Sequence, residues 1–419
     1  MRFVSRRYAE LAAATPNDIS PLFFLMAGLV GILQVHYQPV GWGSGFEMIS
    51  IAKNLANHGA FANPFTALNT GLTANNPPLC PLLLAFLMKL LKRPPLILWA
   101  AVLGSIMANA ITAALLPYVS FLFFGEAISG AAASVLWLGA MQPLPAWDTS
   151  YTVAGLLAFV LLTASDINKS KHVVRLGALA GIVAGLLFLL NPSSLLVFLP
   201  WPLYLYIRTR THAPHALKYC SVLLVAMCVL PVAWATRNYR QLGAFVVRTN
   251  LGMTLYASNN DCAQSTIIQE RLSGCYEAHH ANHNAREAEL VRSLGEVRYD
   301  RMRIADTKNW IFSNPSRFFR LTLTRFRDFW LPPAEVDSGY HAHFIFMITV
   351  LSLPGLILMG YRREPVISFV LGVLLLYPLM YYIVVTDIRY RYPILWLSLL
   401  PAGYCVRQLL EIGKNRSTS

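Results

Sequence analysis

Long apolar runs separated by short polar loops constrain this chain more than any other feature of its sequence. Of its 419 residues, 56% are hydrophobic and only 13% are charged. Soluble proteins average about 25% charged residues, and a helix needs about 20 apolar residues to cross a bilayer. The runs have that length and lack the short alternating segments of a membrane barrel. The sequence therefore predicts an all-α polytopic membrane protein.

One further apolar segment, 77–95, is short and bounded by prolines. It is either an additional span or a helix at the membrane interface. With ten spans and both termini inside, most basic loops face the cytoplasm, as the positive-inside rule expects. An eleventh span would place those loops outside, so 77–95 is predicted to lie at the interface. The ten predicted spans are 20–37, 96–123, 126–142, 150–165, 173–190, 193–208, 216–236, 341–360, 365–385 and 391–411.

This topology divides the chain into three parts. Residues 1–236 form an N-terminal membrane module whose first outer-face loop is 38–95. Residues 237–340 form an extracytoplasmic region, and residues 341–419 form the last membrane helices and a cytoplasmic tail. The net charge of +14 follows from basic loops between spans, so it indicates membrane topology and not nucleic-acid binding. We expect a multi-pass protein of the inner (plasma) membrane with cytoplasmic N- and C-termini.

Two carboxylates lie near the predicted outer membrane face. Glu47 is the only acid in 38–65, where "FEMISIAKNLANHGAF" predicts an amphipathic juxtamembrane helix that ends at Gly59. Asp148 precedes the span that begins near Ser150. One explanation is structural: an acid in the first turn stabilises a helix through its dipole or by capping its N-terminus. The other is catalytic: the carboxylate accepts a proton during a reaction. The sequence leaves both explanations open.

The stretch "TDIRYRYPI" places Arg389 and Arg391 two residues apart at the outer membrane face, with Tyr390 between them. They are either snorkelling side chains in an interfacial tyrosine belt or a site for a lipid phosphate, which the planar guanidinium binds bidentately. The second explanation is favoured because basic residues on the outer face oppose the usual charge bias. Arg237, in "ATRNYRQLG", raises the same question.

The polar region 237–340 contains two cysteines and three neighbouring histidines, and the role of each group has two possible explanations. In an oxidising compartment, Cys262 and Cys275 would form a disulfide, although spacing alone does not decide it. His279, His280 and His283 are metal-ligand candidates because histidines four residues apart share a helix face. No matched acid accompanies them, so plain surface histidines are favoured.

Six stretches match, in order and spacing, the pattern of a known group of membrane enzymes. They are "IAKNLANHGAFANPF" (51–65), "GLTANNPPLCPLLLAFL" (71–87), "RNYRQLGAFVVRTNLGMTLYASNN" (237–260), "LGEVRYDR" (294–301), "NPSRFFRLTLTRFRDFW" (314–330) and "RYRYPI" (389–394). Through them the chain resembles the GT-C superfamily of membrane glycosyltransferases. It is most similar to the bacterial proteins related to dolichyl-phosphate-mannose protein mannosyltransferase, aminoarabinose transferase and the Rgt-type sugar transferases.

The sequence departs from that pattern at Cys80, where Tyr is common, and at Asn314, which stands in place of His, and one further departure bears on the site. The family usually carries an Asp about eight residues before the Ala of its "IAxNLA" helix, and counting back from Ala52 reaches Ser44. Either Glu47 takes the role of that acid or the first-loop acid is absent.

The resemblance implies a GT-C-like bundle of about ten transmembrane helices, with juxtamembrane helices and an outer-face soluble region. It implies an inverting glycosyltransferase that moves a sugar from a polyprenyl-phosphate-linked donor to a lipid, glycan or protein acceptor on the periplasmic, extracytoplasmic face. No cofactor is certain, and a divalent metal is left open. The implied catalytic residues are Glu47 and Asp148, and the implied donor-phosphate ligands are Arg389, Arg391, Tyr390 and Arg237.

Two other classes of function remain as alternatives. A polyprenol or lipid-sugar transporter or flippase should carry ionisable residues or broken spans at mid-membrane. The predicted spans carry almost no charge, and their one internal break, "LLNPSSLL" (189–196), falls between two spans on the outer side. A non-catalytic GT-C-like partner protein is the other alternative, because the usual first-loop Asp is missing.

Overall fold

The structure is a computed structural model of the chain. It describes residues 15–37, 41, 46–145, 148–164, 172–208, 213–333 and 340–418, apart from the side chains of residues 213 and 413–418. Among these residues, the only extended pairing consists of two isolated bridges, Ala62 with Leu72 and Thr266 with Thr386. The remainder forms helices and loops, so the predicted all-α fold is confirmed for the part of the chain described.

The apolar helices of the membrane bundle fall into a long group and a short group. Five are long and apolar enough to cross a membrane: α2 (Pro16–Tyr37), α5 (Pro94–Phe124), α8 (Val173–Leu190), α11 (Ala213–Leu242) and α18 (Tyr340–Tyr361). Shorter apolar helices are α4 (Leu79–Leu91), α6 (Ile128–Ala140), α7 (Asp148–Thr163), α19 (Ile367–Leu376) and α20 (Leu379–Ile383). A polytopic membrane protein is confirmed, whereas the count of about ten spans stays a prediction.

Two of the predicted spans differ from simple helices. The segment 193–208 is divided among η1 (Pro192–Ser194), α9 (Leu195–Phe198) and α10 (Pro200–Arg208). Prolines at the start of η1 and α10 interrupt the hydrogen-bond ladder there, because proline has no N–H to donate. The segment 365–385 is divided between α19 and α20, whereas residues 392–411 lie within the single helix α21 (Tyr392–Thr418).

Small residues allow the bundle helices to pack closely. Gly177, Gly181 and Gly185 recur every four residues along α8 and face α11, as in small-xxx-small membrane interfaces. A Cβ added at Gly181 would lie 2.4 Å from the carbonyl oxygen of Leu223. The helices therefore approach at a distance that only glycine permits at this position.

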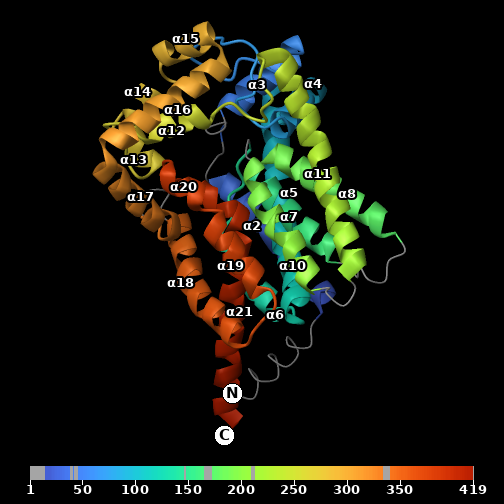
Figure 1. Cartoon of the computed structure of the whole chain (residues 1–419). Coiled ribbons are helices and arrows are strands. Elements are labelled where there is room, and N and C mark those ends of the chain that lie inside the picture. Colours follow the sequence, from blue (N-terminus) through green and yellow to red (C-terminus); the bar gives the residue numbers. More distant parts are fainter. Residues whose placement is uncertain are drawn as a thin grey trace.

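Two short helices lie at one end of the bundle (Figure 1). α3 (Phe46–His58) packs on α4 through an apolar cluster that includes Ile49, Ala52 and Leu84. The 13 residues of α4 extend about 20 Å at 1.5 Å per residue, which is less than the roughly 30 Å hydrocarbon core. Because α6 has the same length and was predicted to span, the length of α4 does not decide between the two placements, and the interfacial position of 77–95 stays a prediction.

The polar region gathers at the same end as α3 and α4, opposite the C-terminal end of α21 (Figure 1). The Cys262–Cys275 disulfide is present, with a Cα–Cα separation of 5.7 Å. The region comprises α12 (Leu251–Ser258), α13 (Ile267–Leu272), α14 (Cys275–His279), α15 (Ala285–Leu294), α16 (Glu296–Ser313) and α17 (Pro315–Trp330).

Glu296, the first residue of α16, attaches this region to the first loop. Its carboxylate accepts hydrogen bonds from the Thr73 hydroxyl, from the Ala74 N–H at 2.9 Å and from the Thr249 hydroxyl at 2.5 Å. The side chain is buried, so these bonds replace the solvent that burial removes. One carboxylate thereby joins three segments that are distant in the sequence and holds the first loop against the polar region.

Candidate active site

Glu47 lies in the first turn of α3, as predicted from the sequence. Its Oε1 is 3.7 Å from Nε2 of His280, which directly follows α14. The N–H of Asn282 donates to Nδ1 of His280 at 3.2 Å. Because Nδ1 accepts, the neutral imidazole carries its proton on Nε2, directed at the Glu47 carboxylate. Ser44, where the family's acid usually stands, lies outside the described residues.

The surroundings of His280 keep it neutral. The ring is only 8% exposed and stacks on Tyr276 with a centroid distance of 4.7 Å and an interplanar angle of 20°. Burial lowers the pKa of His280 below its ordinary value, although the Glu47 charge acts in the opposite direction. His280 therefore directs a neutral N–H towards Glu47 at 3.7 Å and is not a competing positive charge.

The interpretation of all three histidines as plain surface residues is wrong for His280. His283 is exposed and His279 is half-buried, but His280 is buried against α3. Three histidines within five positions carry no local signal that distinguishes them. The contact with Glu47 requires α3 and α14 to be brought together, and only the tertiary structure does that.

Asp148 is the first residue of α7 and precedes the predicted span. Burial raises the pKa of its carboxyl, while the charges of Arg248 and Arg389 act to lower it. The charges of Arg248 and Arg389, which come from other parts of the chain, thus act on the pKa of Asp148. The first-turn position predicted for Asp148 is present, and this charged environment goes beyond a helix-capping role.

Arg248 is the residue of this centre that sequence reasoning missed. It lies between α11 and α12, and its Nε donates to the Asn75 carbonyl at 2.7 Å. The residue as a whole is exposed to solvent. Protein atoms nevertheless surround its guanidinium, and this burial lowers its pKa, whereas the charges of Asp148, Tyr390 and Glu47 act to raise it. Arg248 therefore combines an accessible side chain with the influence of two carboxylates.

Arg389 and Tyr390 belong to the same centre, on η4 (Ile388–Arg391). Nε of Arg389 is 3.2 Å from Asp387, and Tyr390 stacks on Tyr381 with centroids 4.7 Å apart. Burial would lower the pKa of Arg389, but Asp387 and Tyr390 raise it above its ordinary value. The guanidinium is therefore permanently charged and held in place by its own loop.

The side chains of Arg391 and Arg237 bond to groups of the protein itself. Arg391 is 1% exposed and donates to the Trp330 carbonyl at 2.8 Å and the Thr349 hydroxyl at 2.5 Å. Arg237 donates to the Thr73 carbonyl at 2.8 Å and the Phe61 carbonyl at 3.3 Å. Both guanidinium groups bond to other segments of the protein. These bonds explain the presence of two arginines at the outer face even if neither binds a ligand. Their predicted phosphate contact stays a prediction and is not part of the centre described above.

The described residues offer one set of three side chains close enough for a metal ion, namely Cys262, Cys275 and His279. The two sulfurs form a disulfide, so neither supplies the thiolate that binds a metal. Glu47 and Asp148 are not part of any such set within the described chain. No chemical step below depends on a metal.

No family model and no curated protein matches this sequence. Its structure, however, matches solved membrane glycosyltransferases of the GT-C class. One is the oligosaccharyltransferase AglB from Archaeoglobus fulgidus, in complex with an inhibitory peptide and a dolichol-phosphate. There the TM-score is 0.50 at 12% identity, over 94% of this chain and 50% of that one.

A second match is an Archaeoglobus fulgidus oligosaccharyltransferase in complex with Zn and sulfate. There the TM-score is 0.52 at 13% identity, over 93% of this chain and 49% of that one. The chain thus spans about half the length of these enzymes. At such low identity the likeness shows the fold, so the predicted GT-C-like architecture is confirmed.

Proposed function

We propose that this protein is a membrane glycosyltransferase that moves a sugar from a polyprenyl-phosphate donor to an acceptor. One observation carries the proposal. The charges of Glu47 and Asp148 act on the pKa of Arg248, and the charges of Arg248 and Arg389 act on the pKa of Asp148, although the four groups come from four separate segments. Such a convergence suits a reaction that needs a base and a site for a leaving phosphate.

Glu47 is the proposed general base. Its carboxylate accepts the proton of an acceptor hydroxyl or amine, and that oxygen or nitrogen forms a bond to the anomeric carbon of the sugar. The bond from the anomeric carbon to the phosphate oxygen breaks, and the phosphate leaves with the electron pair. A single displacement of this kind inverts the anomeric configuration. His280 positions Glu47 through its Nε2–H.

Arg248 and Arg389 are the proposed ligands of the donor phosphate. Planar guanidinium groups bind phosphate bidentately, and their charge offsets the charge that develops on the leaving group. Asp148 interacts with both, so we assign it the role of orienting them. Tyr390, stacked on Tyr381, forms an aromatic wall beside Arg389.

The donor and acceptor classes follow from the resemblance and from one structural neighbour. That neighbour was solved with a dolichol-phosphate and a peptide, which supports a polyprenyl-phosphate donor for this chain. The acceptor is a lipid, glycan or protein, and membrane lipids surround the bundle.

We place the site on the periplasmic face of the inner membrane and both termini in the cytoplasm. The Cys262–Cys275 disulfide supports this orientation, because disulfides persist in oxidising compartments. The C-terminal end of α21 lies opposite α3 and the polar region, which also fits (Figure 1).

Reconstitution in liposomes tests the proposal. Glu47→Gln should reduce sugar transfer from lipid extracts to acceptors by about 10²–10⁴-fold, the usual contribution of a general base. Glu289→Gln is the matched control, because Glu289 is half-exposed and pairs only with its helix neighbour Arg292. Arg248→Ala should weaken binding of undecaprenyl phosphate.

Wild-type transfer by Glu47→Gln would overturn the assignment of the base. Unchanged affinity of Arg248→Ala for undecaprenyl phosphate would overturn the phosphate site. Movement of lipid-linked sugar between leaflets without any transfer would favour the transporter alternative.

A further inference from the structure

A cavity of about 440 Å³ lies in the polar region, apart from the Glu47 centre. α12, α16 and the disulfide-bonded segment surround it. His279 lines the cavity, whereas the next residue, His280, faces Glu47. The end of α14 thus separates the cavity from the centre. The lining residues are Tyr256, Asn259, Asn260, Asp261, Cys262, His279, Asp306 and Trp310.

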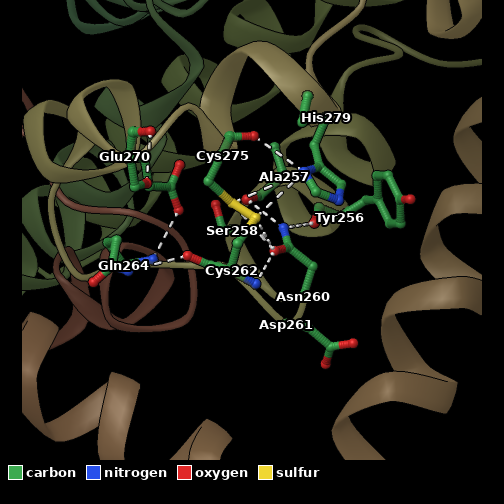
Figure 2. Close-up of a disulfide and its surroundings, with 12 residues drawn as sticks. Tyr256, Ala257, Ser258, Asn260, Asp261, Cys262, Gln264, Glu270, Cys275 and His279 are labelled. Atoms are coloured by element: carbon green, nitrogen blue, oxygen red, sulfur yellow. Dashed lines mark hydrogen bonds between the residues drawn. A yellow bond between two sulfur atoms is a disulfide. The ribbon is translucent and has the colours of Figure 1, made fainter.

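The wall near the disulfide is held rigid by hydrogen bonds (Figure 2). Asn260 accepts from the Cys262 N–H at 2.9 Å and donates to the Tyr256 carbonyl at 3.0 Å. Nδ1 of His279 lies 3.0 Å from the Cys275 carbonyl, and its ring packs edge-on against Tyr256. Asp261 extends away from the disulfide in Figure 2. A cavity with such fixed walls is preformed for a ligand.

The opposite wall presents an aromatic face beside a carboxylate. Asp306 and Trp310 are four residues apart on α16 and therefore share one helix face. Nε1 of Trp310 donates to Asp261 at 2.8 Å, which orients the indole. Arg303 covers Tyr256 at 3.9 Å, so that ring is already occupied. Trp310 is partly exposed and lines the cavity, so its side chain is accessible to a ligand.

The charges in the cavity restrict its occupant. Asp261 and Asp306 are acids, and neither lysine nor arginine is among the lining residues. The nearby guanidinium of Arg303 is held by Glu287 and by Asp306, the latter at 2.8 Å. A phosphate or an acidic sugar would be repelled, whereas an uncharged or amino-bearing ligand would not.

We propose that this cavity is a carbohydrate subsite for an uncharged or amino-substituted sugar. Its volume falls within the range of about 300–1,000 Å³ for small-molecule sites. The apolar C–H face of a pyranose packs on the Trp310 indole, and its hydroxyls bond to Asp261 and Asp306. Resting on the proposed function, this subsite holds a sugar residue of a glycan acceptor beside the Glu47 centre.

Binding to the purified, full-length protein in detergent tests the subsite without transfer. Saturation-transfer NMR would use methyl glucoside, glucosamine and glucuronate as probes, on the Glu47→Gln background. The first two should bind at least tenfold more tightly than glucuronate. Trp310→Ala should remove at least nine-tenths of the transferred signal, and Trp310→Phe should retain most of it. Phe312→Ala is the matched control, because Phe312 lies on the same helix and is 83% exposed.

Equal signals from wild-type and Trp310→Ala would overturn the proposal, as would the absence of binding by glucoside and glucosamine. Tighter binding of glucuronate would overturn the charge argument. Displacement of the sugars by a tri-lysine peptide at lower concentration would reassign the cavity to a cationic peptide. Since the background is already inactive, failure here is distinct from failure of the proposed function.

Discussion

Replacement of His280 by Ala should lower the transfer rate without abolishing it. The substitution removes the Nε2–H that faces Glu47, 3.7 Å away. It also removes the Nδ1 acceptor of the Asn282 N–H and the ring that stacks on Tyr276. The base itself remains, so the variant should be a weaker catalyst with a similar donor affinity.

The size of the effect follows from the geometry. At 3.7 Å the contact is longer than an ordinary hydrogen bond, so it acts as a short-range dipole–charge interaction. A loss of about 1–2 kcal/mol is expected, which is less than the 1.5–3 kcal/mol of hydrogen bonds to charged groups. That corresponds to a fall in kcat of about 5–30-fold. KM for the lipid donor should change by less than about twofold, because a neutral His280 adds no charge beside the proposed phosphate ligands.

The assay is transfer by reconstituted protein, with kcat and KM for the lipid donor measured separately. His283→Ala serves as the control, since His283 is exposed and three residues away. A fall in kcat above 10³-fold would refute the positioning role and make His280 a catalytic group. An unchanged kcat would show that Glu47 needs no such neighbour.

Two further predictions concern stability. Cys275→Ser, or reduction of the disulfide, should lower the unfolding temperature measured by scanning fluorimetry, because closing a loop of about 15 residues stabilises by about 3 kcal/mol; an unchanged midpoint would contradict this. Burial raises the pKa of Glu270 to about 8 from 4.5, with Arg325 opposing the shift. The folded state therefore retains a proton that the unfolded state releases, so the stabilisation present below pH 4.5 is lost as the pH rises towards 8. Glu270→Gln should flatten this dependence, and a parallel pH profile for wild type and variant would exclude Glu270 as its source.

Much of the fold was predictable because it depends on local physics. Apolar runs of membrane length select helices, since backbone groups inside a bilayer must bond within their own segment. Gly59, with a φ of 71°, ends α3 as its sequence position predicts. The interfacial assignment of 77–95 followed from charge, and the length of α4 does not decide it.

The candidate site was predictable only in part. Glu47, Asp148 and Arg389 were identified from residue type and from their position at the membrane face. Arg248 was overlooked because "FVVRTN" has no local feature that separates a site residue from a loop residue. Arg391 illustrates the converse, since an identical residue type two positions from Arg389 is buried and bonded to the protein.

The sequence by itself therefore determined the class of protein, the helices and the stock of charged groups at one membrane face. The tertiary structure alone decided which of those groups meet. It placed His280 against Glu47 and Arg248 among the acids, and it opened the cavity beside the disulfide. The physical reason is range: hydropathy and helix capping act within a few residues, whereas a site is assembled from packing and electrostatic contacts between segments far apart in the chain.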